Sequence, residues 1–239
     1  MIDKDLARFA ERLAKDLGPE LVSLILFGSA ASGEYSDHFS DVNLLCVVRA
    51  ANPAALAAAG PAFSWWSARR KTLPVLVAEA ELAGYARCFP IEFKDLKRSR
   101  RVLHGSDPVA GLELDDAYYR AEVEQELRSK LLRLRQRAGC VYHDKQLLTR
   151  LMADSFTTFL ALGRHAVALG AGDPPASRAE VLAALESRFA LDTGAFRTLM
   201  DVRDGALRGK TLDAAGLFAR YLDTVERLVG AACGAESRS

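Results

Sequence analysis

The order of apolar and polar positions in the first part of the chain predicts alternating helices and strands. Apolar residues recur at helical spacing over residues 6–17, and Gly18-Pro19 ends the pattern, so we expect a helix there. Residues 21–27 and 42–48 are short apolar runs bounded by polar or small residues. Runs of this length and composition are typical of buried strands.

The segments that follow continue this mixed pattern. Residues 51–66 are rich in alanine and favour a helix, which Gly60-Pro61 is expected to break or kink. Residues 74–78 predict another strand, and residues 79–87 predict a short helix. The segment FPIEFKDL, residues 89–96, alternates apolar and polar side chains, as a half-exposed strand does.

The pattern changes after RRVLHGSDP, residues 100–108, which we interpret as a connecting turn. Beyond it, nearly every segment has helical spacing, with Gly, Pro or Asp between segments. The predicted helices cover residues 118–137, 145–169, 178–189, 194–203 and 212–232. We therefore predict an α+β protein with a small mixed-sheet domain over residues 1–110 and an all-α helical bundle over residues 111–239.

Composition narrows the class of protein. Of 239 residues, 50% are hydrophobic and 26% charged, which is ordinary for a globular chain. A net charge of +1 argues against a dedicated nucleic-acid binder but allows a local basic groove. The four cysteines have no CxxC spacing, which favours free thiols in a reducing compartment. The charged amphipathic start and the lack of a membrane-length apolar run predict a soluble, cytoplasmic protein.

The stretch with the clearest chemistry is LILFGSAASGEYSDHFSDVNLLCVV, in which a polar loop joins the first two strands. A strand that ends in Gly28-Ser29 and leads into a helix offers backbone N–H groups, a hydroxyl donor and the positive end of a helix. These groups suit a phosphate, although a plain turn explains the same residues. Asp41 and Asn43 share one face of the next strand, and Val42 faces the core. Their oxygens suit a hard divalent cation that bridges to phosphates.

These residues resemble a known signature. LFGSAASGEYSDHFSDVNLL is similar to the motif of the nucleotidyltransferase superfamily, which has the DNA polymerase β-like fold: Gly-Ser, a loop, then Asp-x-Asp or Asp-x-Glu on the next strand. VSLILFGSAASGEYS resembles small bacterial members, among them the aminoglycoside nucleotidyltransferases and the minimal ones with helical partners. The resemblance implies magnesium-dependent transfer of a nucleoside monophosphate from an NTP to a hydroxyl of a small molecule or protein. Gly28 and Ser29 would bind the triphosphate, and Asp41 would ligate Mg²⁺.

The family takes a further carboxylate from a later strand, and Glu92 in FPIEF is the best match. The resemblance implies that Glu92 ligates the metal or acts as general base toward the acceptor hydroxyl. Asp95 is the second choice, because three positions along a strand it would face the other side. A solvent-facing strand acid is the alternative interpretation of Glu92.

Asn43 departs from the family pattern, which has an acid at this position. Three interpretations follow. Asn43 is a neutral metal ligand in an active enzyme, completed by Glu92 and the substrate phosphates. Alternatively, the chain is a catalytically impaired nucleotide-binding or regulatory protein that keeps the fold. In the third interpretation, Asp37 in the loop replaces the missing acid.

Trp65-Trp66, just before the basic residues 69–71, is a weaker candidate. Aromatic and basic groups together fit a base-stacking or phosphate-binding surface. One core tryptophan and one half-exposed tryptophan at the end of a helix is the simpler interpretation.

The helical half offers no decisive site. Basic residues of the helix 118–137 are spread around it, so we expect a solvated surface. Arg137 and His143 have the spacing of helical HEPN ribonucleases, which also arises by chance. Glu122, Asp144 and Asp154 are candidate acceptor-side bases, and nothing in the sequence selects one of them. The sequence leaves open whether the protein is a homo-oligomer.

Overall fold

The computed structural model describes residues 2–32, 42–169, 174–175, 177–209 and 212–234. It has the expected α+β composition, and it divides into two compact units, Met1–Tyr119 and Arg120–Ser239. The expected domain boundary, near residue 110, precedes α6 (Asp116–Val141), whereas the division between the units falls within the first turn of that helix. Each unit is described separately below.

The first unit is built on a four-stranded sheet with the order β3-β2-β1-β4. Its strands are β1 (Leu21–Phe27), β2 (Asn43–Val48), β3 (Val75–Ala78) and β4 (Arg100–Gly105). β1 is antiparallel to both β2 and β4, and β2 is parallel to β3. The strands predicted for residues 21–27, 42–48 and 74–78 are therefore confirmed.

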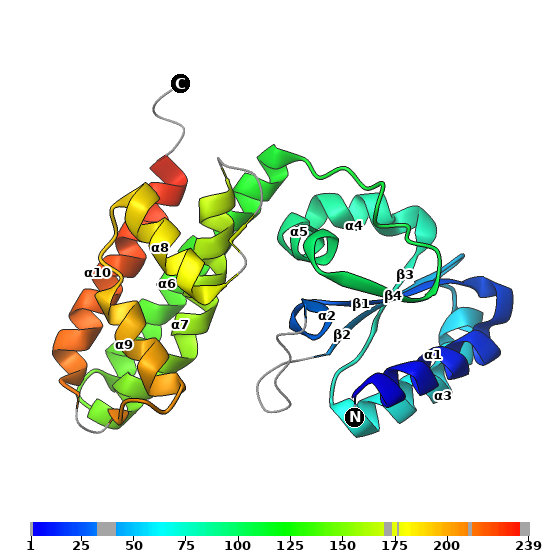
Figure 1. The fold of residues 1–239 in the computed structure, drawn as a ribbon, viewed down its shortest axis with the longest axis horizontal. Coiled ribbons are helices and arrows are strands. Elements are labelled where there is room, and N and C mark those ends of the chain that lie inside the picture. Colours follow the sequence, from blue (N-terminus) through cyan, green and yellow to red (C-terminus); the bar gives the residue numbers. More distant parts are fainter. Residues whose placement is uncertain (1, 33–41, 170–173, 176, 210–211, 235–239) are drawn as a thin grey trace. The chain divides into compact units, whose positions relative to one another are not determined.

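Helices cover both faces of this sheet (Figure 1). α1 (Ile2–Leu17) and α3 (Pro53–Arg70) lie on one face, and α4 (Leu82–Cys88) and α5 (Pro90–Arg98) lie on the other. Short turns of helix, η1 (Gly18–Glu20), α2 (Ser29–Ser32) and η2 (Glu79–Glu81), complete the unit.

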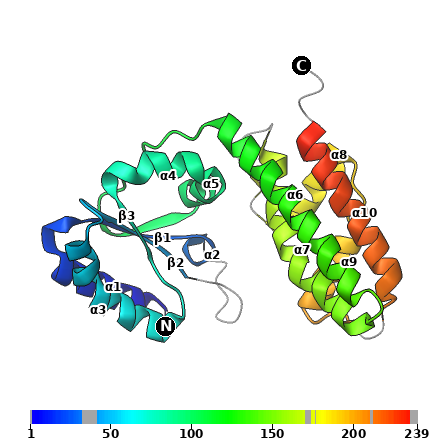
Figure 2. The ribbon, with the colours of Figure 1, turned by 180° about the vertical axis from the view of Figure 1, so that it is seen from behind.

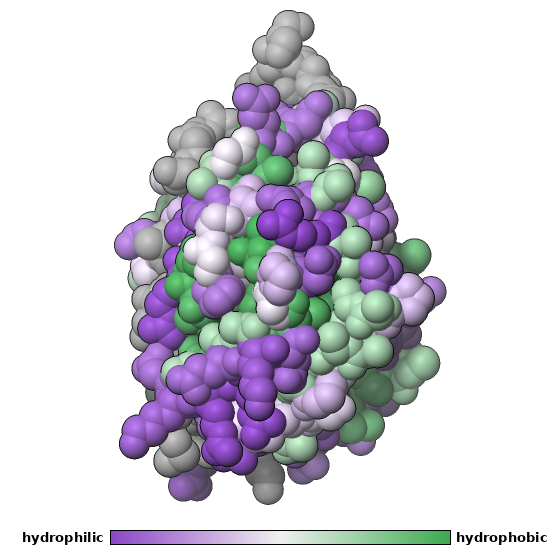
Figure 3. All heavy atoms as spheres, turned by 90° about the vertical axis from the view of Figure 1, so that its right-hand side faces the viewer, coloured by the Kyte–Doolittle hydropathy of each residue, from purple (hydrophilic) through white to green (hydrophobic). Residues whose placement is uncertain are grey.

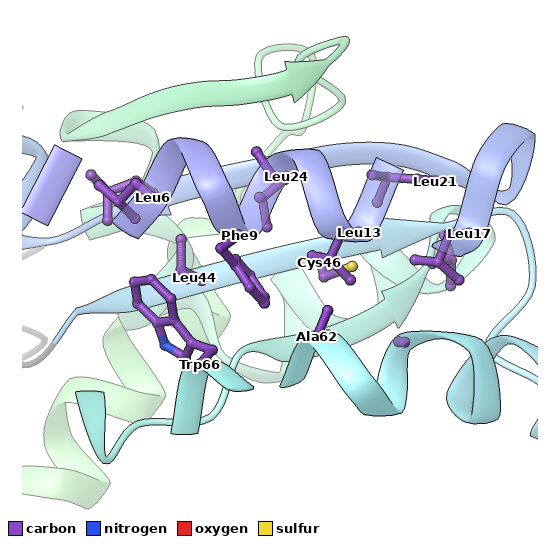
Figure 4. Packing of buried hydrophobic residues seen from close by; sticks show 14 of the residues in the cluster. Leu6, Phe9, Leu13, Leu17, Leu21, Leu24, Leu44, Cys46, Ala62 and Trp66 are labelled. Carbon is purple, nitrogen blue, oxygen red and sulfur yellow. The ribbon is translucent and has the colours of Figure 1, made fainter. Parts of the chain in front are cut away.

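Alternate residues of the central strands belong to two separate hydrophobic cores. Leu24 and Leu44 pack with α1 and α3, where Phe9 and Trp66 meet at 4.9 Å between ring centroids (Figure 4). Ile25 and its neighbours on β2 pack with α4 and α5. Because both faces of β1 and β2 are buried, these strands read as continuous apolar runs in the sequence.

α3 continues through Gly60-Pro61, so the expected break is wrong. The Asn52 side chain caps the helix by accepting the Ala55 N–H at 2.9 Å, and Lys71 ends it with a left-handed φ of 56°. Pro61 has no N–H group to donate to the carbonyl of Ala57. Both residues are exposed, so water can hydrogen-bond to that carbonyl instead.

Two further expectations for this unit are wrong. FPIEFKDL is not a strand but α5, with Pro90 in its first turn and with Phe93 and Leu96 buried on one side. Pro90 favours a helix start because its missing N–H has no partner in the first turn of a helix. RRVLHGSDP is not only a turn, since its first six residues form the edge strand β4.

The second unit is a bundle made of α6, α7 (Lys145–Ala168), α8 (Arg178–Phe189), α9 (Gly194–Arg203) and α10 (Ala214–Cys233). All five helices agree with the predicted segments. α10 lies beside α6 (Figure 2), and Arg135 on α6 forms an ion pair with Glu226 on α10 at 2.8 Å. Polar side chains start three of the helices, because Asp144, Ser177 and Asp213 each accept hydrogen bonds from N–H groups in the following turn.

Aromatic rings fill the centre of the second unit. Phe156 and Phe196 meet edge to face at 5.4 Å between centroids, and Phe196 lies 5.6 Å from Tyr221.

None of the helices in the described ranges is both long enough and apolar enough to cross a bilayer. On the face shown in Figure 3, hydrophobic residues form small patches between hydrophilic ones, as is usual for a surface in contact with water.

Candidate active site at the end of β1

β1 ends in a tight turn at Gly28. Its φ of 76° lies in the left-handed region, which glycine adopts without the cost that other residues bear. The Gly28 carbonyl accepts the Ala31 N–H at 2.9 Å, so the turn leads directly into α2. The Gly28 N–H donates to the Ser99 carbonyl at 3.2 Å, and the Ser99 hydroxyl donates back to the Gly28 carbonyl at 3.3 Å. The turn is thus held in place by the residue that precedes β4.

Asn43 lies directly beside this turn. It is the first residue of β2 and is paired with Phe27 in the β1–β2 ladder. A Cβ atom on Gly28 would lie 3.1 Å from Asn43 Nδ2, which is tighter than ordinary contact. Asn43 is itself exposed to solvent. Gly28 and Asn43 therefore meet at one end of the central strand, with the amide group of Asn43 accessible.

The start of β2 is anchored in the core below. Val42 is buried, as its expected inward orientation requires. The Thr72 hydroxyl donates to the Val42 carbonyl at 3.3 Å and accepts the Trp66 Nε1 hydrogen at 3.2 Å. This chain of hydrogen bonds fixes the backbone from which Asn43 projects.

The remaining members of the predicted metal and phosphate set lie outside the described residues. Asp41 and Asp37 belong to the segment 33–41, and the side chain of Ser29 is also undescribed, although its backbone begins α2. Within the ranges that the structure does describe, no three Asp, Glu, His or Cys residues form a group that could hold a metal ion. The roles of Asp41, Ser29 and Asn43 stay predictions from the sequence.

Glu92 and Asp95 lie on the same side of a helix, whereas the sequence predicted opposite faces of a strand. Both lie on α5 rather than on a strand, so residues three apart are neighbours on one side of the helix. The main-chain carbonyl of Asp95 accepts the Ser99 N–H at 2.9 Å, and Ser99 binds Gly28, so the C-terminal end of α5 is linked to the turn. The argument that preferred Glu92 because Asp95 faces the other way is therefore wrong. The role of either carboxylate stays a prediction.

Arg100 was missed in the sequence. It begins β4, is paired with Phe27, and forms an ion pair with Asp107 at 2.8 Å. Burial opposes ionisation of Asp107, but the hydrogen bond and charge of Arg100 outweigh it and hold the pKa of Asp107 below its ordinary value. The ion pair ties the two ends of RRVLHGSDP together. The Val102-Leu103 pair was the only sign of a strand in an otherwise basic segment.

Trp65 and Trp66 take the simpler of the two predicted arrangements. Trp66 is fully buried, whereas Trp65 is half-buried. Three guanidinium groups lie over the Trp65 ring at 4.9 to 5.6 Å from its centroid, those of Arg8, Arg12 and Arg69. They cover the ring that a stacked base would need, so these contacts favour a structural role.

The histidines of the second unit are placed at a turn and in the core. His143 lies in the turn between α6 and α7, with its ring against the edge of Tyr142 at 5.7 Å. Arg137 lines a pocket whose lining does not include His143. His165 is buried in α7.

No protein-family model and no curated protein matches this chain. Among solved structures, a similar one is spectinomycin adenyltransferase AAD(9) from Enterococcus faecialis, determined with ATP and spectinomycin. The likeness covers 93% of this chain and 99% of that one, with a TM-score of 0.57 and 11% identity. The chain has a nucleotidyltransferase-like fold. This confirms the fold inferred from the Gly28-Ser29 motif, and the 93% coverage means that the likeness includes parts of both units.

Proposed function

We propose that this protein transfers a nucleoside monophosphate from an NTP to a hydroxyl group of a small molecule or a protein, with Mg²⁺. The contact between Gly28 and Asn43, at the end of the central strand of a nucleotidyltransferase-like fold, is the observation that carries the proposal. The similar structure holds ATP and spectinomycin, which supports an NTP together with a small acceptor.

In this proposal the turn at Gly28 binds the triphosphate. The left-handed turn starts α2, and the first N–H groups of a helix have no partner within it. Those groups and the hydroxyl of Ser29 bind phosphate oxygens. A Cβ atom on residue 28 would lie 3.1 Å from Asn43 Nδ2, so a side chain there would require the Asn43 amide to shift by a few tenths of an ångström.

The donors available at the start of β2 are compatible with Mg²⁺. This ion prefers oxygen ligands and is commonly held by one or two carboxylates together with substrate phosphates. Asp41 supplies a carboxylate and Asn43 an exposed, neutral amide oxygen. A cation held there would supply positive charge to offset that of the phosphates. With one acid fewer than the family pattern, we expect weaker metal binding.

The proton of the acceptor hydroxyl is taken by a carboxylate of α5. Glu92 remains the proposed base and an additional metal ligand, and Asp95 is its neighbour on the same side of the helix. Removal of the proton as the new bond to phosphorus forms is what makes a hydroxyl an effective nucleophile.

The direct test is release of pyrophosphate from each of the four common NTPs with Mg²⁺ and a panel of hydroxyl acceptors. We expect acceptor-dependent release by the wild type and loss of release in Asp41→Ala. Asp16→Ala is a matched control, because Asp16 is an exposed acid of α1 in the same unit. Equal activity of Asp41→Ala and the control would refute the proposed site.

A second candidate function is nucleotide binding without turnover, which the neutral side chain of Asn43 favours. A bound nucleotide raises the melting temperature by mass action. A magnesium-dependent rise in melting temperature with no pyrophosphate release would favour this alternative. Turnover gained in Asn43→Asp would then identify residue 43 as the cause.

A further inference from the structure

α6 and α7 of the helical unit line a pocket of about 270 Å³. Lys130, Arg133 and Arg137 line it from α6, and Asp154, Ser155 and Thr158 line it from α7, with leucine and phenylalanine side chains between them. The three basic residues follow a spacing of three and then four along α6, which places them on one side of the helix. The basic residues expected to be spread around this helix therefore converge in part.

The basic residues of the pocket differ in whether they form ion pairs. Lys130 forms an ion pair with Glu126 at 3.2 Å, and Asp154 forms one with Arg150 at 3.6 Å. Within the part of the chain that the structure describes, Arg133 and Arg137 make no ion pair or side-chain hydrogen bond. Arg135, between them in sequence, is paired with Glu226 outside the pocket. Of Arg133, Arg135 and Arg137, the two that line the pocket are thus the two with no carboxylate partner among the described residues.

The wall formed by α7 is held firmly. The Ser155 hydroxyl donates to the Leu151 carbonyl at 2.8 Å and lies 2.8 Å from the hydroxyl of the buried Tyr221. These bonds occupy the Ser155 hydroxyl and fix the turn of α7 that faces the arginines. Thr158 adds a hydroxyl, and Leu134 and Phe159 add apolar surface.

This combination indicates the chemical class of a ligand. The planar fork of a guanidinium matches two oxygens of one phosphate, and two such forks side by side suit a phosphate better than a single carboxylate. The volume lies just below the usual range for small-molecule pockets, which indicates a compact ligand. The apolar side chains suit its carbon skeleton.

We propose that the pocket between α6 and α7 binds a compact phosphate-bearing small molecule, with Arg133 and Arg137 on the phosphate. The proposal concerns the second unit alone and does not depend on the proposed nucleotide site at Gly28. A polymer backbone is a poorer fit, because the pocket is small and Leu134, Leu151 and Phe159 form part of its lining.

The test is an NMR titration of the ¹⁵N-labelled full-length protein without divalent cations, using pyrophosphate, ribose 5-phosphate and ribose. We expect saturable shifts of amide signals in residues 130–137 and 151–159 with both phosphates and none with ribose. Arg133→Gln and Arg137→Gln should each weaken binding about three- to tenfold, since each removes a charge-assisted hydrogen bond. Arg133→Lys keeps the positive charge but lacks the planar guanidinium. Its affinity for the phosphates should lie between that of the glutamine variants and that of the wild type.

Arg220→Gln is the matched control, because Arg220 is an exposed arginine of α10 outside the pocket. It should bind as the wild type does. Equal weakening in this control would show a general effect of charge and overturn the proposal. Shifts confined to the turn at Gly28, or a response to an oligonucleotide but to neither small phosphate, would also overturn it.

Discussion

Gly28 and Asn43 lie so close at the end of β1 that a Cβ atom on residue 28 would be 3.1 Å from Asn43 Nδ2. Glycine is favoured there for two separate reasons, the left-handed φ of 76° and the small shift that a Cβ atom would demand of the Asn43 amide. The first reason is a property of the turn alone, whereas the second depends on the neighbouring strand. A double substitution can therefore separate them.

We expect Gly28→Ala to lower the free energy of unfolding by about 1–3 kcal/mol, since alanine is strained in this region and its Cβ would press on Asn43. Urea denaturation measures the change. Part of the loss should be recovered in the Asn43→Ala background, where the crowding is relieved. Gly84→Ala is the control: Gly84 is an exposed helical residue with open space at its Cβ position, so alanine should be neutral or stabilising by up to about 1 kcal/mol. A loss of stability in Gly28→Ala that Asn43→Ala does not reduce would show that the contact with Asn43 adds nothing.

Asn43→Asp should strengthen magnesium-dependent nucleotide binding by about tenfold, because it restores a charged oxygen ligand beside Asp41. The measurement is the rise in melting temperature with an NTP, in the presence and absence of Mg²⁺. Asn52→Asp is a useful comparison, since Asn52 is a helix cap in which aspartate serves equally well. If magnesium-dependent nucleotide binding is unchanged in Asn43→Asp, as it should be in Asn52→Asp, residue 43 is not a metal ligand.

The Arg100–Asp107 ion pair gives the stability of the first unit a defined pH dependence. Because the pKa of Asp107 is lowered in the folded state, its ionised form stabilises the fold at pH values above the pKa in the unfolded chain. That contribution is lost as the pH falls through the lower, folded-state pKa. We expect Asp107→Asn to be less stable than the wild type at about pH 7, with a difference that shrinks as the pH is lowered to about 2. Urea denaturation across this range tests it, with Asp16→Asn as the control, and a constant difference would contradict it.

The central strands and the helical bundle could be predicted because their patterns are long or unambiguous. β1 and β2 are apolar on both faces, and each helix of the second unit spans several turns with a clear start or stop. The strand prediction for FPIEFKDL was wrong because its eight residues fit both the period of a strand and the period of a helix. Phe89, Ile91 and Phe93 alternate as in a strand, but Pro90, Phe93 and Leu96 are the positions that become buried, at the spacing of a helix.

The edge strand β4 was missed for the opposite reason. It pairs with β1 on one side only, and most of its side chains are exposed or half-buried, so it needs no apolar pattern. Local sequence also gave no sign that Ser99 holds the turn at Gly28, because the two residues are 71 positions apart along the chain. The Gly28-Ser29 turn was predicted because the residue types of this motif stand close together in sequence.

Because α5 is a helix and not the predicted strand, both of its candidate acceptor bases have to be tested. Glu92 and Asp95 share one side of α5, so both can reach the same region, and only one is expected to take the proton. We expect Glu92→Gln to lower kcat by about 10²- to 10⁴-fold with little change in the KM for NTP, and Asp95→Asn to have a smaller effect. Steady-state kinetics of pyrophosphate release measures both, and Glu20→Gln, an exposed acid before β1, is the control. A large loss of kcat in Asp95→Asn alone would assign the base to Asp95, whose carbonyl already binds the residue that holds the turn at Gly28.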